Sequence, residues 1–188
     1  MTESPATGAQ ASASELERRI RTVPDFPRPG VSYKDVTPLI EDGASLHAAV
    51  DALATATDYL AYDRILSAEA RGFVFGTALA YRAQKGLILA RKPGKLPRET
   101  ISASYDLEYG TDALEIHSDS IPRGTRVLVA DDLLATGGTA RAMCQLVENA
   151  GGAVAGVAFL IELAYLEGRA QLRPYEVISV VTYDSPDD

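Results

Sequence analysis

The stretch VLVADDLLATGGTA, residues 127–140, decides which fold the sequence predicts. It starts as a continuous run of apolar residues, which is typical of a strand that is buried on both faces. The run ends in two adjacent carboxylates, Asp131 and Asp132, and a short turn then leads to Thr-Gly-Gly-Thr at the start of a predicted helix. A buried strand followed by a helix is the repeating unit of parallel α/β sheets. Ligands of such sheets bind where the strands end, so we expect a functional site in this stretch.

The loop ATGGT, residues 135–139, has the features of a phosphate cradle. Its two glycines lack a Cβ, so their N–H groups can approach an oxyanion closely, and its two threonines add hydroxyl donors. The helix N-terminus that follows adds partial positive charge. Asp131 and Asp132 would repel phosphate, but they suit a sugar diol or a divalent cation. A solvated turn with a good helix cap would explain the loop alone, but not two acids at the end of an apolar strand. The combination indicates a ribose 5-phosphate site.

The same alternation of apolar strands and helices extends along the chain. Strands are predicted over residues 64–69, 86–91, 125–132, 152–163 and 175–183, and helices over 44–60, 72–83 and 139–149. Apolar runs separated by helices indicate a Rossmann-like α/β fold, with a mainly parallel sheet flanked by helices.

The 188 residues are enough for one domain, which we place at 15–185. Residues 1–14 are poor in large apolar groups and are predicted to be a mobile tail. Ser14 and Glu17 have the spacing of a capping box, which predicts a helix over 14–23. Residues 93–120 break the α/β pattern and are predicted to form a loose hairpin that acts as a flexible flap.

The charge is unevenly distributed. The net charge is -8, yet residues 71–98 contain seven basic residues and no acid. A basic block in an acidic protein indicates a local anion site and argues against general affinity for nucleic acid or acidic membranes. The longest apolar stretch, residues 153–161, is far shorter than the roughly 20 residues that span a bilayer. The single cysteine, Cys144, excludes an intrachain disulfide and favours a cytoplasmic location.

Five blocks of sequence resemble a known family. They are PDFPRPGVSYKDVTPLI (24–40), EARGFVFG (69–76), RKPGKLP (91–97), ASYDLEYG (103–110) and VLVADDLLATGGT (127–139). The last resembles the motif by which type I phosphoribosyltransferases bind 5-phosphoribosyl 1-pyrophosphate (PRPP), and the whole set resembles the adenine phosphoribosyltransferase family. The resemblance implies that fold, with a hood at 24–40 and a catalytic flap. It also implies purine salvage by the reaction of adenine with PRPP to give AMP and pyrophosphate, together with Mg²⁺ and a homodimer.

The resemblance assigns the PRPP-binding residues. It gives Asp131 and Asp132 to the ribose hydroxyls, and it gives the 5-phosphate to Ala135, Thr136, Gly137, Gly138 and Thr139. The pyrophosphate loop would be Glu69, Ala70, Arg71 and Gly72, with a cis peptide between Glu69 and Ala70; Arg91, Lys92 and Lys95 would neutralise pyrophosphate. No direct protein ligand of Mg²⁺ is assigned, because PRPP and water would hold most of the ion.

The resemblance also assigns the base site and the flap. Ser32, Tyr33 and Lys34 would form the hood over adenine, and Leu133 would lie against one face of the base. Glu108 matches the acid/base group that works near N7, and Tyr105 and Tyr109 would either close over PRPP or pack the flap. Phe26 could stack on the base, but a core position is the expectation. Many relatives carry arginine in place of Lys34, so lysine would weaken base selection only where a guanidinium makes the contact.

Two other functions compete with this one. An enzyme of the same superfamily could prefer hypoxanthine, guanine or xanthine, although the hood and the LEYG flap argue against that. A regulator could sense PRPP without turning it over. Such a regulator needs a DNA-binding domain or a basic face, which the short acidic sequence does not offer.

Overall fold

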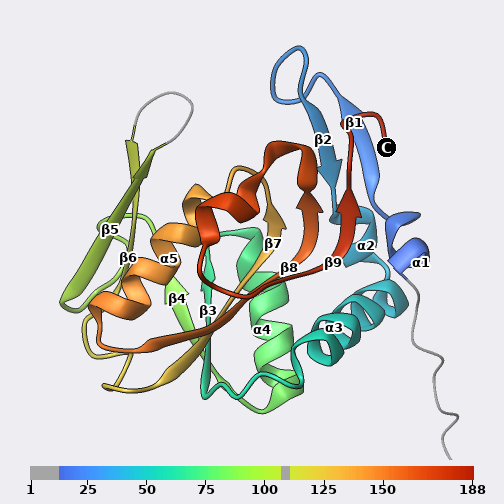
Figure 1. Cartoon of the computed structure of the whole chain (residues 1–188). Helices are drawn as coiled ribbons and strands as arrows, with labels where there is room; N and C mark the ends of the chain where they lie inside the picture. Colours follow the sequence, from blue (N-terminus) through green and yellow to red (C-terminus); the bar gives the residue numbers. More distant parts are fainter. Residues whose placement is uncertain (1–12, 107–110) are drawn as a thin grey trace, which may run out of the picture.

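The computed structural model describes residues 13–106 and 111–188 and centres on a five-stranded sheet in the order β4-β3-β7-β8-β9 (Figure 1). Every pair of neighbouring strands in this sheet is parallel. The strands are β3 (Arg64–Ala68), β4 (Gly86–Ala90), β7 (Arg126–Leu134), β8 (Ala153–Leu163) and β9 (Val177–Tyr183). The predicted parallel α/β sheet is confirmed.

Helices cover both faces of the sheet, and this explains why its strands are apolar throughout. On one face, α3 (Gly43–Thr57) and α4 (Arg71–Ala83) share a buried cluster with Ile65 and Leu128. On the other, α5 (Gly138–Asn149) shares a cluster with Leu66, Val127 and Val129. Successive strand residues point to opposite faces, so strands that are buried on both sides need apolar residues at every position.

The amino-terminal region differs from the prediction. The first helix, α1 (Ala13–Glu17), ends early, and the rest of the predicted 14–23 helix is wrong. Instead, β1 (Arg21–Pro24) pairs antiparallel with β2 (Ser32–Asp35), so that Val23 lies opposite Tyr33. The proline-rich turn between them returns the chain on itself. A short helix that the sequence analysis did not predict, α2 (Thr37–Glu41), follows with a proline in its first turn.

An antiparallel hairpin forms a separate two-stranded sheet beside α5 (Figure 1). It consists of β5 (Thr100–Asp106) and β6 (Thr111–His117), which confirms the hairpin predicted within 93–120. Between β8 and β9 the chain forms two 3-10 helices, η1 (Ala164–Leu166) and η2 (Gly168–Leu172), in place of an α-helix. Within the described ranges, no helix has the length and apolar character needed to cross a membrane. Residues 1–12 of the predicted tail, and Glu108 and Tyr109 of the flap, lie outside the described residues.

The strand order places a topological switch point between β3 and β7. From β3 the chain crosses through α4 to β4, and it later returns through β7 on the other side of β3. Loops that leave two adjacent parallel strands in opposite directions open a crevice at their carboxyl ends, where ligands bind. The switch point therefore brings residues 69–72, after β3, next to the end of β7.

Candidate active site

Two buried carboxylates lie near the end of β7. Asp131 and Asp132 are 9% and 7% exposed, and the Asp132 N–H donates a hydrogen bond to Asp131 Oδ1 at 2.9 Å. Burial, and next the negative charge of Asp132, raise the pKa of the Asp131 carboxyl well above its ordinary value. A pair of acids that is this costly to bury indicates a binding role rather than a structural one.

The loop after β3 packs directly against this pair. Gly72, the second residue of α4, lies so close to Asp131 that a Cβ at this position would collide with the carboxylate. The absence of a side chain at Gly72 therefore lets the loop and β7 meet. The peptide bond between Glu69 and Ala70 is cis, as the resemblance implies.

Arg71 connects three parts of the chain at the switch point. Its Nε lies 2.5 Å from Asp132 Oδ2, and its Nη1 donates a hydrogen bond to the Tyr33 hydroxyl. Burial would lower the pKa of Arg71, but the charge of Asp132 and the hydrogen bond to it raise that pKa above its ordinary value. The side chain is still 45% exposed, so the guanidinium remains accessible to an anionic ligand.

The predicted phosphate loop joins β7 to α5 and lines a small cavity of about 80 Å³. Asp131 and Leu133 line the same cavity. Gly137 has a φ of +89°, a conformation that favours glycine. The 3-10 helix η2 lies directly behind the loop. A Cβ on Gly137 would come within 2.6 Å of the Gly168 carbonyl oxygen. A Cβ on Gly168 would in turn collide with the carbonyl oxygen of Ala135. Backbone-to-backbone packing thus fixes the position of the loop.

Five cations of the basic block form ion pairs with carboxylates, among them Arg91 and Lys92. Glu69 accepts hydrogen bonds from Arg91 at 2.9 and 3.0 Å and from the Lys92 N–H at 2.6 Å. That N–H, and then the Arg91 side chain, lower the pKa of Glu69. Lys92 Nζ forms an ion pair with Asp112 of the hairpin at 3.0 Å, while Lys95 is exposed. Asp112 also accepts a hydrogen bond from the Tyr105 hydroxyl at 3.3 Å.

Comparison of the chain with known proteins shows which family it belongs to. The family model of the phosphoribosyl transferase domain matches residues 61–187. The chain is 73% identical over 172 residues to the adenine phosphoribosyltransferase of Rubrobacter xylanophilus, an alignment that covers 91% of this chain and 93% of that relative. The chain belongs to the adenine phosphoribosyltransferase family.

Solved structures of adenine phosphoribosyltransferases have the same fold. The enzyme from Thermoanaerobacter pseudethanolicus superimposes with a TM-score of 0.90 at 48% identity, covering 92% of this chain and 100% of that one. The enzyme from Saccharomyces cerevisiae, solved with an imino-altritol bisphosphate and adenine, gives a TM-score of 0.85 at 36% identity, covering 90% and 98% of the two chains.

In this adenine phosphoribosyltransferase family member, the predicted hood carries an aromatic pair, one exposed and one half-buried side chain. Phe26 and Tyr33 pack edge to face with their ring centroids 5.0 Å apart, and both line a cavity of about 310 Å³. Phe26 is 51% exposed, so the expected core position is wrong. Phe26 lies in the proline-rich turn between β1 and β2, outside the paired strands.

The structure does not bring the side chains of Ser32 and Lys34 to Arg71. Lys34 Nζ donates hydrogen bonds to Thr22 Oγ1 at 3.0 Å and to the main-chain oxygen of Asp188, and it lies 4.2 Å from the centroid of the Tyr183 ring. Burial lowers the pKa of Lys34. Ser32 Oγ donates to the Pro186 carbonyl at 2.7 Å. Adjacent strand residues face opposite sides, so Tyr33 points toward Arg71 while its two neighbours face the carboxyl-terminal segment.

Sequence analysis missed several residues around the phosphate loop. Gly168 supports the loop from behind, and Arg141 of α5 donates a hydrogen bond to Gln171 of η2 at 3.2 Å. Residues 164–172 show no strand or helix periodicity, so no pattern pointed to them. Only their packing against the loop identifies them.

Proposed function

We propose that this site transfers the 5-phosphoribosyl group of PRPP to adenine, giving AMP and pyrophosphate in purine salvage. The main support for the proposal is one observation: at the switch point Arg71 pairs with Asp132, beside the uncharged predicted phosphate loop. A cation, two acids and a phosphate cradle match the pyrophosphate, the ribose hydroxyls and the 5-phosphate of PRPP. Membership of the adenine phosphoribosyltransferase family supplies adenine as the acceptor.

Binding of PRPP would exchange ion pairs within the protein for ion pairs with the ligand. Asp131 and Asp132 would accept hydrogen bonds from the ribose 2- and 3-hydroxyls, and residues 135–139 would donate to the 5-phosphate. Arg71 would then leave Asp132 and pair with pyrophosphate, helped by Lys92, Lys95 and Arg91. The partial exposure of the Arg71 side chain supports such a change of partner.

Adenine would lie between the end of β7 and the hood. Leu133 offers an apolar surface on one side, and the exposed Phe26 with the half-buried Tyr33 offers aromatic surface on the other. The Lys34 side chain is held by the carboxyl-terminal segment, so any contact of Lys34 with the base would be made by its main chain. Main-chain selection of adenine does not depend on whether lysine or arginine occupies this position.

The reaction is a displacement at C1′ of the ribose. The bond from C1′ to the pyrophosphate oxygen breaks as the bond from C1′ to a purine nitrogen forms, through an oxocarbenium-like transition state. Positive charge develops on the ribose near Asp131 and Asp132, and negative charge develops on pyrophosphate near Arg71, so the site stabilises both. Glu108 would accept or return the purine proton near N7. Water competes with adenine as nucleophile, so the hairpin would exclude it.

The residues at the site fit a magnesium ion that PRPP brings with it. Among the described residues, no group of three or more acidic, histidine or cysteine side chains could hold a metal by itself. Magnesium usually keeps several waters and takes one or two carboxylates together with substrate phosphates. Asp131 and Asp132 are the carboxylates placed to contribute, directly or through water. When bound, the ion would neutralise charge on the departing pyrophosphate.

We further propose that the chain forms a homodimer through α4 and the edge strand β4. Val74 and Tyr81 lie two turns apart on one face of α4, and they are 38% and 88% exposed. Leu89 on β4 is 42% exposed. Leu87, two residues earlier on the same face of the strand, lies against Gly76 of α4. Exposed apolar side chains gathered on one face favour contact with a second copy. The cytoplasmic location and the lack of nucleic-acid binding remain predictions from composition and charge.

The test of the main proposal uses purified protein, PRPP and Mg²⁺ with adenine, hypoxanthine, guanine or xanthine in separate reactions. Nucleotide formation is followed by chromatography. We expect AMP from adenine and no nucleotide from the other bases. Turnover of another base in preference to adenine would favour the related enzymes. Binding of PRPP without turnover of any base would favour the sensor.

A further inference from the structure

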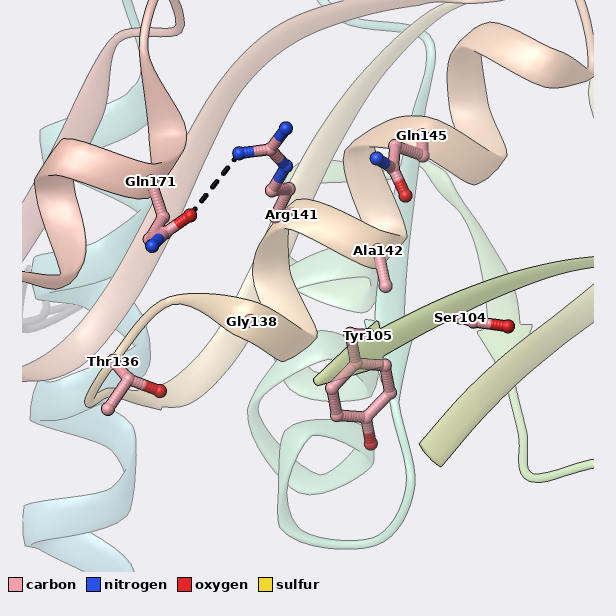
Figure 2. A pocket seen from close by; sticks show the side chains of 8 residues that line it. All are labelled: Ser104, Tyr105, Thr136, Gly138, Arg141, Ala142, Gln145 and Gln171. Atoms are coloured by element: carbon pink, nitrogen blue, oxygen red, sulfur yellow. Dashed lines mark hydrogen bonds between the residues drawn. The ribbon is translucent and has the colours of Figure 1, made fainter. Parts of the chain in front are cut away.

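A polar groove runs along α5, starting at the phosphate loop (Figure 2). Gly138, Arg141 and Gln145 form part of its floor on one face of the helix, because residues three and four apart share a helix face. Tyr105 of the hairpin and Gln171 of η2 stand on its two sides. Its volume is about 520 Å³, within the range of small-molecule sites. Apart from the loop itself and Tyr105 of the predicted flap, none of the residues that line this groove has a role in the reaction described above.

The lining of the groove suits an anion. None of the eight described residues that line it is acidic, although the chain carries a net charge of -8. Arg141 supplies a cation, and its Nη1 is oriented by the hydrogen bond to Gln171 Oε1 at 3.2 Å (Figure 2). The remaining N–H groups of the guanidinium form a fork that can donate to phosphate oxygens.

The groove is continuous with the predicted 5-phosphate site. Thr136 and Gly138 line both the groove and the small cavity of the phosphate loop. Three residues of helix rise separate Gly138 from Arg141, which is about 4.5 Å along the axis. A second phosphate group attached to the first can extend over such a distance.

We propose that this groove binds the distal phosphate of a nucleoside 5′-diphosphate whose proximal phosphate occupies the loop. Arg141 contacts the distal phosphate, and Gln171 positions Arg141. The proposal rests on the proposed function, because it takes the loop to be the 5-phosphate site of AMP. A nucleoside diphosphate then competes with PRPP and inhibits the enzyme, so the groove couples salvage to the level of phosphorylated nucleotides.

The test compares the affinities of ADP and AMP by titration calorimetry at fixed free Mg²⁺, which requires no turnover. The variants are Arg141→Gln, Arg141→Lys and the matched control Arg123→Gln, which removes an exposed arginine from the turn before β7, at the opposite end of the sheet. We expect Arg141→Gln to weaken ADP binding about tenfold and AMP binding less than twofold, since it removes one charge-assisted contact. Arg141→Lys keeps the charge but loses the fork, so its loss of ADP affinity is smaller. Arg123→Gln changes neither affinity.

Three results would overturn the inference. Equal loss of ADP and AMP affinity in Arg141→Gln would place Arg141 on the 5-phosphate itself. Unchanged affinities, or a wild-type protein that binds AMP but not ADP, would exclude the groove as a phosphate site. Failure of the proposed function has a different signature, namely no AMP formed from adenine and PRPP by the wild-type protein.

Discussion

Asp131 is buried beside a second carboxylate, that of Asp132. Burial, and then the charge of Asp132, raise the pKa of Asp131 well above 3.8, so the folded protein binds the Asp131 proton more tightly than the unfolded chain does. This proton linkage favours folding at acidic pH, and the advantage is lost as the pH rises above the unfolded value of 3.8 toward the raised folded value. At neutral pH the carboxyl therefore opposes folding.

Replacing Asp131 with asparagine should stabilise the protein while removing activity. The amide does not ionise, and its oxygen can still accept the hydrogen bond from the Asp132 N–H. We expect the Tm of Asp131→Asn at pH 7 to exceed that of wild type by at least about 2 °C, equivalent to about 1 kcal/mol, and the gain to disappear near pH 3.5. Thermal unfolding at both pH values measures this. Asp58→Asn, at an exposed site after α3, is the control, and a Tm at pH 7 no higher than wild type would contradict the argument.

Glu108 is the residue proposed to move the purine proton. Replacing it with alanine should lower kcat at least tenfold, because general acid–base groups commonly contribute more than that. PRPP binding should change less than threefold, since the proton transfer involves the base. Steady-state kinetics and PRPP titration separate the two effects. Glu99→Ala, in the same acidic stretch, is the matched control. A kcat of Glu108→Ala within a factor of two of wild type would show the role to be wrong.

At the scale of elements, η2 determines where the phosphate loop lies. Gly168 of η2 meets the carbonyl oxygen of Ala135, and Leu134 lies 2.9 Å from where a Cβ on Gly168 would be. The Ala135 carbonyl belongs to the main chain, so it cannot move away without moving the loop. The position of the loop therefore depends on a segment that follows it by some thirty residues.

Gly168→Ala should displace the loop and weaken the binding of phosphorylated ligands. We expect a loss of about 1–3 kcal/mol in stability from overpacking, and a several-fold rise in the KM for PRPP with little change in the KM for adenine. Gly86→Ala is the matched control, because the nearest atom to a Cβ there is 3.9 Å away. Kinetics with each substrate varied in turn provide the measurement. Equal rises in both KM values would indicate general damage instead of displacement of the loop.

The elements of the central sheet were predictable, whereas the amino-terminal ones were not. The apolar run at residues 152–163 begins at a pair of glycines and follows a predicted helix, which favours a buried strand, and β8 confirms it. Leu16 and Ile20 are both buried and lie four residues apart, so the pattern before Arg21 resembles a helix beyond the point where α1 ends. Pairing with β2, about ten residues further along the chain, decides that Arg21–Pro24 is a strand. The local pattern of apolar residues cannot predict this pairing between strands.

At the scale of the whole molecule, the dimer proposal can be tested on the exposed face of α4. The double variant Val74→Lys/Tyr81→Lys places two charges in the proposed interface, so we expect it to sediment as a monomer of 20.0 kDa while wild type sediments as a dimer. Sedimentation velocity distinguishes these masses. Tyr59→Lys, at another exposed tyrosine, should leave the dimer intact. A monomeric wild type would exclude the dimer, and a dimeric double variant would place the interface elsewhere.

The sequence by itself determined the parallel α/β sheet, the separate basic block, and a loop with the chemistry of a phosphate cradle after two acids. Local patterns suffice for these features, because periodicity and loop chemistry act over a few residues. The tertiary structure decided the partnerships: Arg71 meets Asp132 across 61 positions, Phe26 is exposed beside Tyr33, and Lys34 turns to the carboxyl-terminal segment. It also placed Gly168 behind the phosphate loop. Such contacts depend on which strands become neighbours and which face each side chain takes, and no stretch of sequence specifies either alone.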